Sequence, residues 1–514
     1  MGRVTTLLGI MLALLLPYPA AAEPADIDAA ARGVVRVVVI GSDGEEVFPV
    51  SHGTGFAVTP TRIVTNAHVL GEALEDGELR VGVVPGDGEA AVYARVLAVS
   101  ERNDLALLEV TGSLRLPALT IAGGAAAGSG EVSAVGYPMN VDRAQGLAIS
   151  DILQSQPPVK SRGFVSGARP SRQFDTILHT APIASGNSGG PLLDGCGRVI
   201  GVNSFGTDEG GGGAEFFFAV SARELLPFLR ANGIKAQVSG QPCRSLAEIE
   251  AAEREREAAA SAVARDRDAA AQEIQRARRD RAQLEAELAI MEARENHMAV
   301  AFLLTLAAIA AGGLAWYLRD GEHGRRNSLI GGVVAGLAVG GALLAWFTRP
   351  GLEAIDERIA AALSAGGAAL PDAGATGLAA TSGDFTCRID AGRSRIVGAS
   401  SDDVAFAWTS DGCVNGRTQY GAAPNGKWRR VLVPGQEDVA TLQTFDPATR
   451  TLTADRFFLD RAAMRRLRAA RGEAEAPACG AADAGEAAGE AQGALVALLP
   501  DRPNERLVYR CDPK

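Results

Sequence analysis

The sequence is poor in aromatic residues and in positive charge. Aromatic residues make up 5% of the chain, and its formal net charge is −11. Such a charge balance argues against nucleic-acid binding as the main activity, because that function needs a basic surface. The six cysteines include no Cys-x-x-Cys pair, and no histidine, cysteine and carboxylate cluster has the spacing of a metal site. The sequence therefore predicts neither a metal ion nor a cofactor.

Two stretches lack charged residues altogether. Residues 298–318 and 329–347 are apolar, and aromatic residues stand at the end of each. Each stretch has about the length that a membrane-spanning helix needs, and aromatic residues are typical of the membrane interface. The short segment between them, 319–328, carries three arginines and is therefore expected on the cytoplasmic side. The sequence predicts a transmembrane hairpin whose flanking segments both lie outside the cytoplasm.

The second apolar stretch holds a regular glycine repeat, Gly332, Gly336 and Gly340. Small residues four positions apart form a flat helix face on which another helix can pack closely. We expect this face to pack on the first apolar stretch of the same chain. The alternative is a dimer formed with a second copy.

The amino-terminal segment supports the same topology. Residues 1–22 begin with a positive charge at Arg3, continue with an apolar core and end in three alanines. This pattern is typical of a cleaved secretory signal. An uncleaved anchor is the alternative, but the apolar core is too short to span a bilayer comfortably. We expect cleavage, and a protein that works outside the cytoplasm.

Residues 245–297 contain neither proline nor glycine and are rich in charged residues and alanine. Their apolar residues recur at spacings of 3, 4 and 7, which predicts a helix of roughly 80 Å. We expect a coiled coil through which the chain forms a homo-oligomer. Arg256 and Arg281 fall on the apolar seam, so a solvated single helix remains an alternative.

The carboxy-terminal part divides into two segments. Residues 351–380 are rich in alanine and glycine without an apolar pattern, which predicts a linker. Residues 381–514 contain short apolar runs typical of strands, and we expect a small β-rich domain of unknown function.

All six cysteines lie in segments that we place outside the cytoplasm, where disulfides persist. Four cysteines in the last domain allow three pairings. We expect the pairing with the shortest loops, and a third bond at the end of the preceding domain. The expected pairs are Cys387–Cys413, Cys479–Cys511 and Cys196–Cys243.

The strongest candidate for a nucleophile is Ser188, in the segment 186–190, which reads Gly-Asn-Ser-Gly-Gly. A serine hydroxyl is a poor nucleophile at neutral pH, so it needs a base and donors for the oxyanion. The glycines let the backbone bend, so that the N–H groups of Gly186 and Ser188 can point at one position. The same composition is also that of an ordinary turn.

Two upstream segments provide the partners that such a serine needs. His68 follows a strand-like run that itself follows the glycine-rich segment 53–58, and Asp104 precedes the apolar run 105–110. Singly, His68 could be a core histidine and Asp104 a turn cap. Together with the serine they stand in the order His, Asp, Ser, which is the order of chymotrypsin-type proteases.

These segments resemble chymotrypsin-fold, trypsin-like serine proteases of the bacterial HtrA/Deg type, over residues 34–234. The resemblance implies two six-stranded barrels with the active site between them, which agrees with the many short strand-like runs in this range. It implies that Ser188 is the nucleophile and that His68 is the general base and acid. Asp104 would fix the histidine tautomer, and the Gly186 and Ser188 N–H groups would form the oxyanion hole.

The resemblance also bears on the base and on specificity. His52 and His179 are alternative bases, but neither lies in the matching segment, so we expect a structural or surface role for both. In the resembled fold the substrate pocket is built by segments that here contain Ile183, Ser204 and Gly206. These segments hold no charged residue, which predicts a preference for small or medium aliphatic side chains.

The expected architecture is multidomain. It comprises an all-β double-barrel chymotrypsin-like protease domain, a long helix or coiled coil, a two-helix transmembrane hairpin and a small β-rich, disulfide-containing C-terminal domain. We expect no PDZ-like domain, and we find no Ile-Val-Gly-Gly start of the kind that activates zymogens. The oxyanion loop must then be set by the fold itself or by a partner.

The sequence predicts a membrane-tethered, extracytoplasmic serine endopeptidase. The resemblance implies a bacterial inner-membrane location, with the protease and C-terminal domains in the periplasm, and unfolded or regulatory envelope proteins as substrates. The alternative is a catalytically latent scaffold or sensor in the cell envelope that binds a partner protein.

Overall fold

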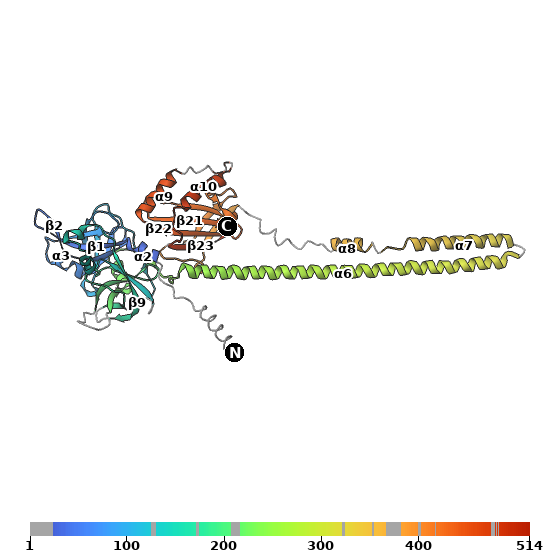
Figure 1. Ribbon diagram of the computed structural model, residues 1–514, viewed down its shortest axis with the longest axis horizontal. Coiled ribbons are helices and arrows are strands. Elements are labelled where there is room, and N and C mark those ends of the chain that lie inside the picture. The colour runs from blue at the N-terminus through green and yellow to red at the C-terminus, as the bar shows by residue number, and fades with distance from the viewer. Residues whose placement is uncertain are drawn as a thin grey trace. The chain divides into compact units, whose positions relative to one another are not determined.

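A computed structural model describes the chain (Figure 1). The described residues are 24–124, 130–170, 174–206, 216–320, 324–351, 354–365, 382–398, 402–416, 418–473, 479, 481 and 483–514. The expected signal segment, residues 1–22, lies outside them, as do the centre of the arginine-containing loop and most of the expected linker. The described chain forms two units, Met1–Glu253 with Ala380–Lys514, and Arg254–Ala379.

The first six strands form a closed antiparallel barrel in the order β1-β2-β3-β6-β5-β4. Strand β1 is a nearly continuous valine-rich run buried on both faces, since successive side chains point to opposite faces of a strand. Val35 and Val37 fill the barrel interior, whereas Val34 packs toward the second barrel. The strands are β1 (Val34–Ser42), β2 (Val47–Thr59), β3 (Arg62–Thr65), β4 (Arg80–Pro85), β5 (Val92–Ser100) and β6 (Leu105–Val110).

A second ring of six strands follows. The order β11-β8-β9-β10-β13-β12 is closed by pairing between β11 and β12, while β7 and β14 extend the sheet from β12. One buried cluster contains residues from both barrels and joins them. The strands are β7 (Ile121–Ala122), β8 (Glu131–Gly136), β9 (Val159–Pro170), β10 (Asp175–His179), β11 (Pro191–Leu193), β12 (Val199–Gly206), β13 (Phe217–Ser221) and β14 (Val238–Ser239).

Short helices surround the barrels. Helix α5 begins after Ser221, whose hydroxyl caps it by accepting from the Arg223 N–H. The helices are α2 (Pro24–Ala31), η1 (His68–Leu70), α3 (Gly71–Glu75), η2 (Glu101–Asn103), α4 (Met139–Ala144), η3 (Ile149–Leu153) and α5 (Ala222–Ala231). The double-barrel architecture is the one expected from the resemblance.

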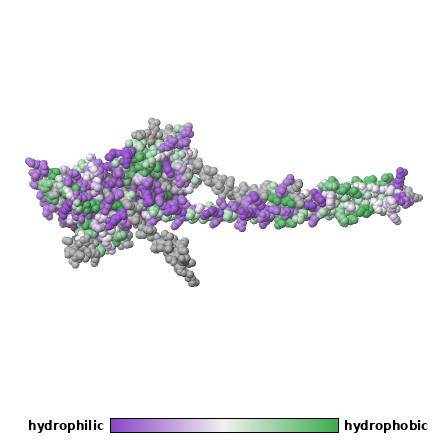
Figure 2. All heavy atoms as spheres, in the orientation of Figure 1, coloured by the Kyte–Doolittle hydropathy of each residue, from purple (hydrophilic) through white to green (hydrophobic). Residues whose placement is uncertain are grey.

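The helical unit contains most of one uninterrupted helix, α6 (Leu246–Tyr317), which begins in the first unit. It also contains η4 (Leu318–Asp320), α7 (Gly324–Phe347) and α8 (Ala354–Ala365). Both α6 and α7 are long and apolar enough to cross a membrane. Figure 2 shows hydrophobic residues gathered over α7 and the neighbouring turns of α6.

The prediction that the glycine repeat of α7 packs on the first apolar stretch, which lies in α6, is wrong. A Cβ on Gly331 would lie 2.5 Å from the Ala315 Cβ, and one on Gly341 would lie 3.2 Å from the Leu304 side chain, so these two glycines pack on α6. At Gly332, Gly336 and Gly340 a Cβ would meet no described atom within 4 Å. The repeat starts one residue later than Gly331, about 100° around the helix, and therefore faces away from α6.

The C-terminal domain, residues 382–514, contains an antiparallel sheet in the order β18-β17-β16-β15-β23-β22-β21-β20-β19. Its edge strands are separated in sequence by one residue, Tyr420, and α9 and α10 pack against the sheet (Figure 1). The elements are β15 (Gly383–Ile389), β16 (Val404–Trp408), β17 (Cys413–Val414), β18 (Thr418–Gln419), β19 (Gly421–Ala422), η6 (Pro424–Gly426), β20 (Trp428–Leu432), β21 (Val439–Asp446), β22 (Thr451–Phe458), α9 (Arg461–Glu473), α10 (Ala484–Val496) and β23 (Glu505–Pro513).

Two of the three expected disulfide pairings are wrong. The C-terminal domain contains Cys387–Cys511 and Cys413–Cys479, whereas Cys196–Cys243 is confirmed. Strands β15 and β23 are neighbours in the sheet and place Cys387 directly opposite Cys511. Sheet topology, and not loop length, therefore decides the pairing.

Candidate active site

His68 and Asp104 come together because strand β3 pairs with β6 in the first barrel. His68 begins η1 after β3, and Asp104 ends η2 just before β6. The His68 Nδ1 lies 3.0 and 2.9 Å from the two carboxylate oxygens, and the His68 backbone N–H donates to Oδ1 over 3.1 Å. Asp104 has a φ of 51°, a left-handed conformation that aspartate tolerates better than most residues. The Asn66 side chain donates to the Asp104 carbonyl and holds this turn.

The environment of Asp104 keeps its carboxylate charged. Burial alone would raise its pKa, but hydrogen bonds from His68 and Ser204 outweigh burial and lower the pKa below its ordinary value. A charged carboxylate accepts the Nδ1 proton, so the other ring nitrogen of His68 is left free to act as a base. The His68 ring itself is half exposed and accessible.

Ser188 lies in the second barrel, in the turn before β11. Its Oγ donates to the Ser204 carbonyl over 2.9 Å, and the Ser204 hydroxyl donates to Asp104 over 2.6 Å. Within the described part of the chain, the Ser188 hydroxyl has no hydrogen bond to His68. Such catalytic hydrogen bonds are often absent or loose before substrate binds.

The backbone around Gly186 is fixed on both sides. The Met139 N–H donates to the Ser185 carbonyl over 2.7 Å, so the trans peptide points the Gly186 N–H the opposite way. The Thr54 hydroxyl donates to the Gly186 carbonyl over 2.6 Å. Gly186 has a φ of 100°, and a Cβ there would lie 2.2 Å from the Tyr137 carbonyl oxygen. This position therefore requires glycine.

The second candidate oxyanion donor is held similarly. The Gly190 N–H donates to the Asn187 carbonyl over 3.0 Å, which orients the peptide that carries the Ser188 N–H. Among the described residues, neither the Gly186 N–H nor the Ser188 N–H has a hydrogen-bond acceptor. Two backbone donors left unpaired beside a serine hydroxyl are what an oxyanion hole needs.

The two alternative histidines are buried elsewhere. His52 lies 3.7 Å from Asp142, near Arg36, and packs behind the nucleophile loop. Burial lowers the pKa of both His52 and His179 to about 4. Neither ring contacts Asp104 in the described residues, which leaves His68 as the histidine that is both exposed and paired with Asp104.

The predicted pocket residues are only partly brought together. Ser204 lies beside Ser188, and its polar groups are engaged with Ser188 and Asp104. A Cβ on Gly206 would lie 3.0 Å from the Phe217 ring, so an aromatic side chain flanks this glycine. Ile183 packs against the core of the second barrel.

The sequence did not reveal how three residues support the site. Ser204 was expected in the pocket, and the structure adds that it bridges Ser188 and Asp104. Thr54 lies in the Gly-Thr-Gly segment on which the resemblance rests. Its hydrogen bonds to the nucleophile loop could be recognised only from the folded structure. Met139 carries no sequence signal, because its contribution is a backbone N–H.

Asp194, Cys196 and Cys243 place donor atoms within 4.8 Å of one another. Both cysteines belong to one disulfide. The trio therefore has no thiolate to offer a metal ion.

Comparison with known proteins agrees with this geometry. Residues 53–202 match the family described as "Trypsin-like peptidase domain". The chain is 35% identical to "Serine protease HTRA2, mitochondrial" of Bos taurus over 209 residues, 40% of this chain and 41% of that protein. It is 31% identical to "Serine protease HTRA4" of Homo sapiens over 207 residues, 40% of each chain. The match thus covers about two fifths of these curated relatives. The chain thus carries a trypsin-like peptidase domain that is similar to those of HtrA-type serine proteases.

Proposed function

We propose that the protein is a serine endopeptidase that cleaves polypeptides through an acyl-enzyme. The observation that carries the proposal is the hydrogen-bonded series from His68 through Asp104 and Ser204 to Ser188, beside two unpaired backbone donors. Each part has a defined use in acyl transfer. The relatives are named as serine proteases, which supports the same reaction class.

The reaction follows from this arrangement. The Ser188 hydroxyl rotates from the Ser204 carbonyl, gives its proton to His68 and attacks the scissile carbonyl carbon. The carbonyl oxygen becomes an oxyanion that the Gly186 and Ser188 N–H groups stabilise. His68 then protonates the leaving amine, and the C–N bond breaks to leave an ester on Ser188. Water, deprotonated by His68, then attacks the ester carbonyl carbon; the bond to the Ser188 Oγ breaks, and His68 returns the proton to this oxygen. Asp104 stabilises the imidazolium in both steps.

Specificity follows from the pocket segments. Ile183 and Gly206 bear no charge, and the Phe217 ring narrows the space beside Gly206. We expect small or medium aliphatic residues before the cleaved bond, since an unpaired buried charge is costly. Unfolded or regulatory envelope proteins are the expected substrates.

The proposed location is the bacterial inner membrane, with α6 and α7 crossing it and the protease and C-terminal domains outside. The exposed hydrophobic residues of α6 and α7 support this proposal. Three disulfides support an oxidising compartment for both domains.

Helix α6 also supports self-association. Ala282, Ala286 and Ile290 are buried on one face. A second stripe lies on the roughly opposite face at 100° per residue, and its members are each more than half exposed. They are Val263, Ile274, Leu284, Leu288 and Met291. We propose that this stripe pairs with the same helix of a second copy.

The second candidate function is a latent scaffold or sensor. The observation that favours it is the Ser188 hydroxyl, which donates to Ser204 and has no described hydrogen bond to His68. Incubating the full chain with an unfolded protein such as casein separates the two. A peptidase yields fragments that Ser188→Ala does not, whereas a scaffold yields none.

A further inference from the structure

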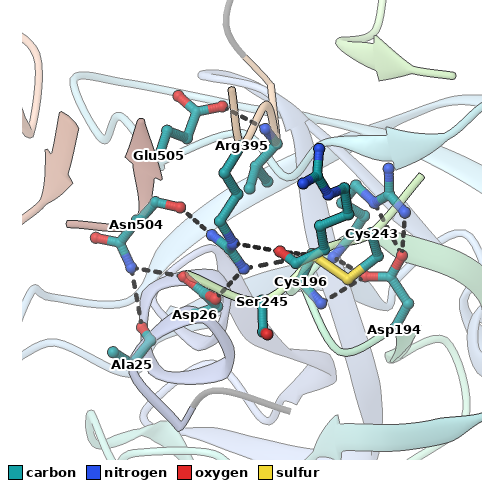
Figure 3. Close-up of polar contacts among 12 residues, drawn as sticks. Ala25, Asp26, Asp194, Cys196, Cys243, Ser245, Arg395, Asn504 and Glu505 are labelled. Carbon is teal, nitrogen blue, oxygen red and sulfur yellow. Dashed lines mark hydrogen bonds and ion pairs between the residues drawn. A yellow bond between two sulfur atoms is a disulfide. The ribbon is translucent and has the colours of Figure 1, made fainter. Parts of the chain in front are cut away.

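The C-terminal domain reaches the second barrel through a buried arginine, Arg395 (Figure 3). Its guanidinium donates to the Asp26 carboxylate of α2 over 2.6 Å and to the Arg244 carbonyl over 2.8 Å. It also lies 3.4 Å from the Cys196 Sγ and donates to the Asn504 carbonyl. Arg395 and Asp26 are 2% and 4% exposed, so water cannot replace either partner.

The contacted turn, 194–198, joins the two strands that serve the candidate active site. Strand β11 begins three residues after Ser188, and β12 contains Ser204. Within the turn, Asp194 accepts from Arg198, and the Cys196–Cys243 disulfide ties it to the segment that Arg395 also contacts. Arg395 therefore fixes the outer end of the hairpin that positions both serines.

The same domain reaches the first barrel through Arg461 of α9. Its side chain pairs with Asp87 over 3.2 Å and with Glu89, both in the connection between β4 and β5. It also donates to the Arg115 carbonyl over 2.9 Å, in the segment after β6. This is the barrel that carries His68 and Asp104.

From these contacts we propose that the C-terminal domain is a clamp across the two barrels, with Arg395 and Arg461 as its positioning residues. The proposal rests on the proposed peptidase function. Proton transfer from Ser188 to His68, and the bond from Ser204 to Asp104, both cross from one barrel to the other. A displacement of about 1 Å in such a site can cost about 100-fold in rate.

The clamp acts on geometry and not on folding. One buried cluster joins the barrels and includes Ile27 of α2, so they stay packed without Arg461. Loss of the clamp lets them shift slightly, which lowers kcat more than it raises KM.

Arg461→Glu tests the proposal, because it places a third carboxylate against Asp87 and Glu89. Arg465→Glu is the matched control, since Arg465 is an exposed arginine on the same helix. Peptide hydrolysis by the full chain is measured per active site, counted by fluorophosphonate titration. We expect kcat to fall at least about tenfold in Arg461→Glu with KM changed less than about twofold. Arg465→Glu should match the parent, and Arg461→Lys should recover most of the loss.

Hydrogen–deuterium exchange provides a readout that does not depend on turnover. Faster exchange at residues 185–190 and 194–198 in Arg461→Glu, but not in Arg465→Glu, supports the clamp. Identical exchange and identical kcat in the two variants overturn it. A parent protein that neither hydrolyses peptide nor reacts with the fluorophosphonate overturns the proposed function instead, and the exchange comparison still decides the clamp.

Discussion

Ser204 donates a 2.6 Å hydrogen bond to the carboxylate of Asp104, although the two residues lie in different barrels. The backbone carbonyl of Ser204 also accepts a hydrogen bond from the Ser188 hydroxyl. Ser204 is thus the point where the strand that lines the proposed substrate site meets the proposed catalytic residues.

The first prediction concerns Ser204→Ala. A hydrogen bond to a charged group contributes about 1.5–3 kcal/mol, and its loss frees the carboxylate that orients His68. We expect kcat to fall roughly 10- to 100-fold, since about 1.4 kcal/mol corresponds to a factor of ten. Steady-state peptide hydrolysis measures the change. A Ser204→Ala protein with undiminished kcat would show that Asp104 needs no support from the second barrel.

The second prediction concerns pH and the buried histidines. The folded-state pKa of His52 and His179 is about 4, below the ordinary value of about 6.5. Between these values the unfolded chain binds protons that the folded chain excludes, so stability falls as pH drops from about 6.5 to about 4. The full effect is on the order of 3 kcal/mol per histidine.

Hydrogen exchange of the barrel strands at several pH values tests this, after correction for intrinsic exchange rates. His52→Gln should weaken the pH dependence while leaving the His179 contribution. A stability that is flat between pH 4 and 6.5 would show that both rings are protonated in the fold.

The third prediction concerns the exposed stripe on α6. Leu288 is 57% exposed and Ala286 6% exposed, on different faces of the same turn. All six native cysteines are paired, so an introduced cysteine is the sole free thiol. Leu288→Cys should form a cross-linked dimer in membranes, and Ala286→Cys should not. Equal cross-linking of both, or of neither, argues against pairing through this stripe.

The fourth prediction concerns topology. The arginine-containing segment 319–328 is expected in the cytoplasm and the flanking domains outside. Reporter fusions after residues 240, 322 and 400 should read outside, inside and outside. A cytoplasmic signal at residue 240 or 400 reverses the proposed orientation.

The protease fold, the candidate catalytic residues and the start of α6 could be predicted because short segments of sequence determine them. The loop around Ser188 and the segments of His68 and Asp104 carry their own turn and strand signals, so their order indicated the fold. The start of α6 followed from the absence of proline and glycine in residues 245–297, whereas the structure continues the same helix through Gly312 and Gly313 to Tyr317.

The errors arose where partners far apart in sequence decide the outcome. Cys387 pairs with Cys511, 124 residues away, because their strands are sheet neighbours. The glycine repeat of α7 faces away from α6. Neither helix sequence alone determines which face of one helix packs on the other. The roles of Ser204 and Arg395 likewise depend on contacts between barrels and domains.

Fluorophosphonate labelling of the full chain, with the modified residue mapped by mass spectrometry, tests the central claim most directly. The reagent reacts with a serine only when a base and an oxyanion site activate it. We predict modification of Ser188 in the parent protein and its loss in His68→Ala. An unmodified Ser188 in a folded parent protein would contradict the peptidase and leave the latent scaffold.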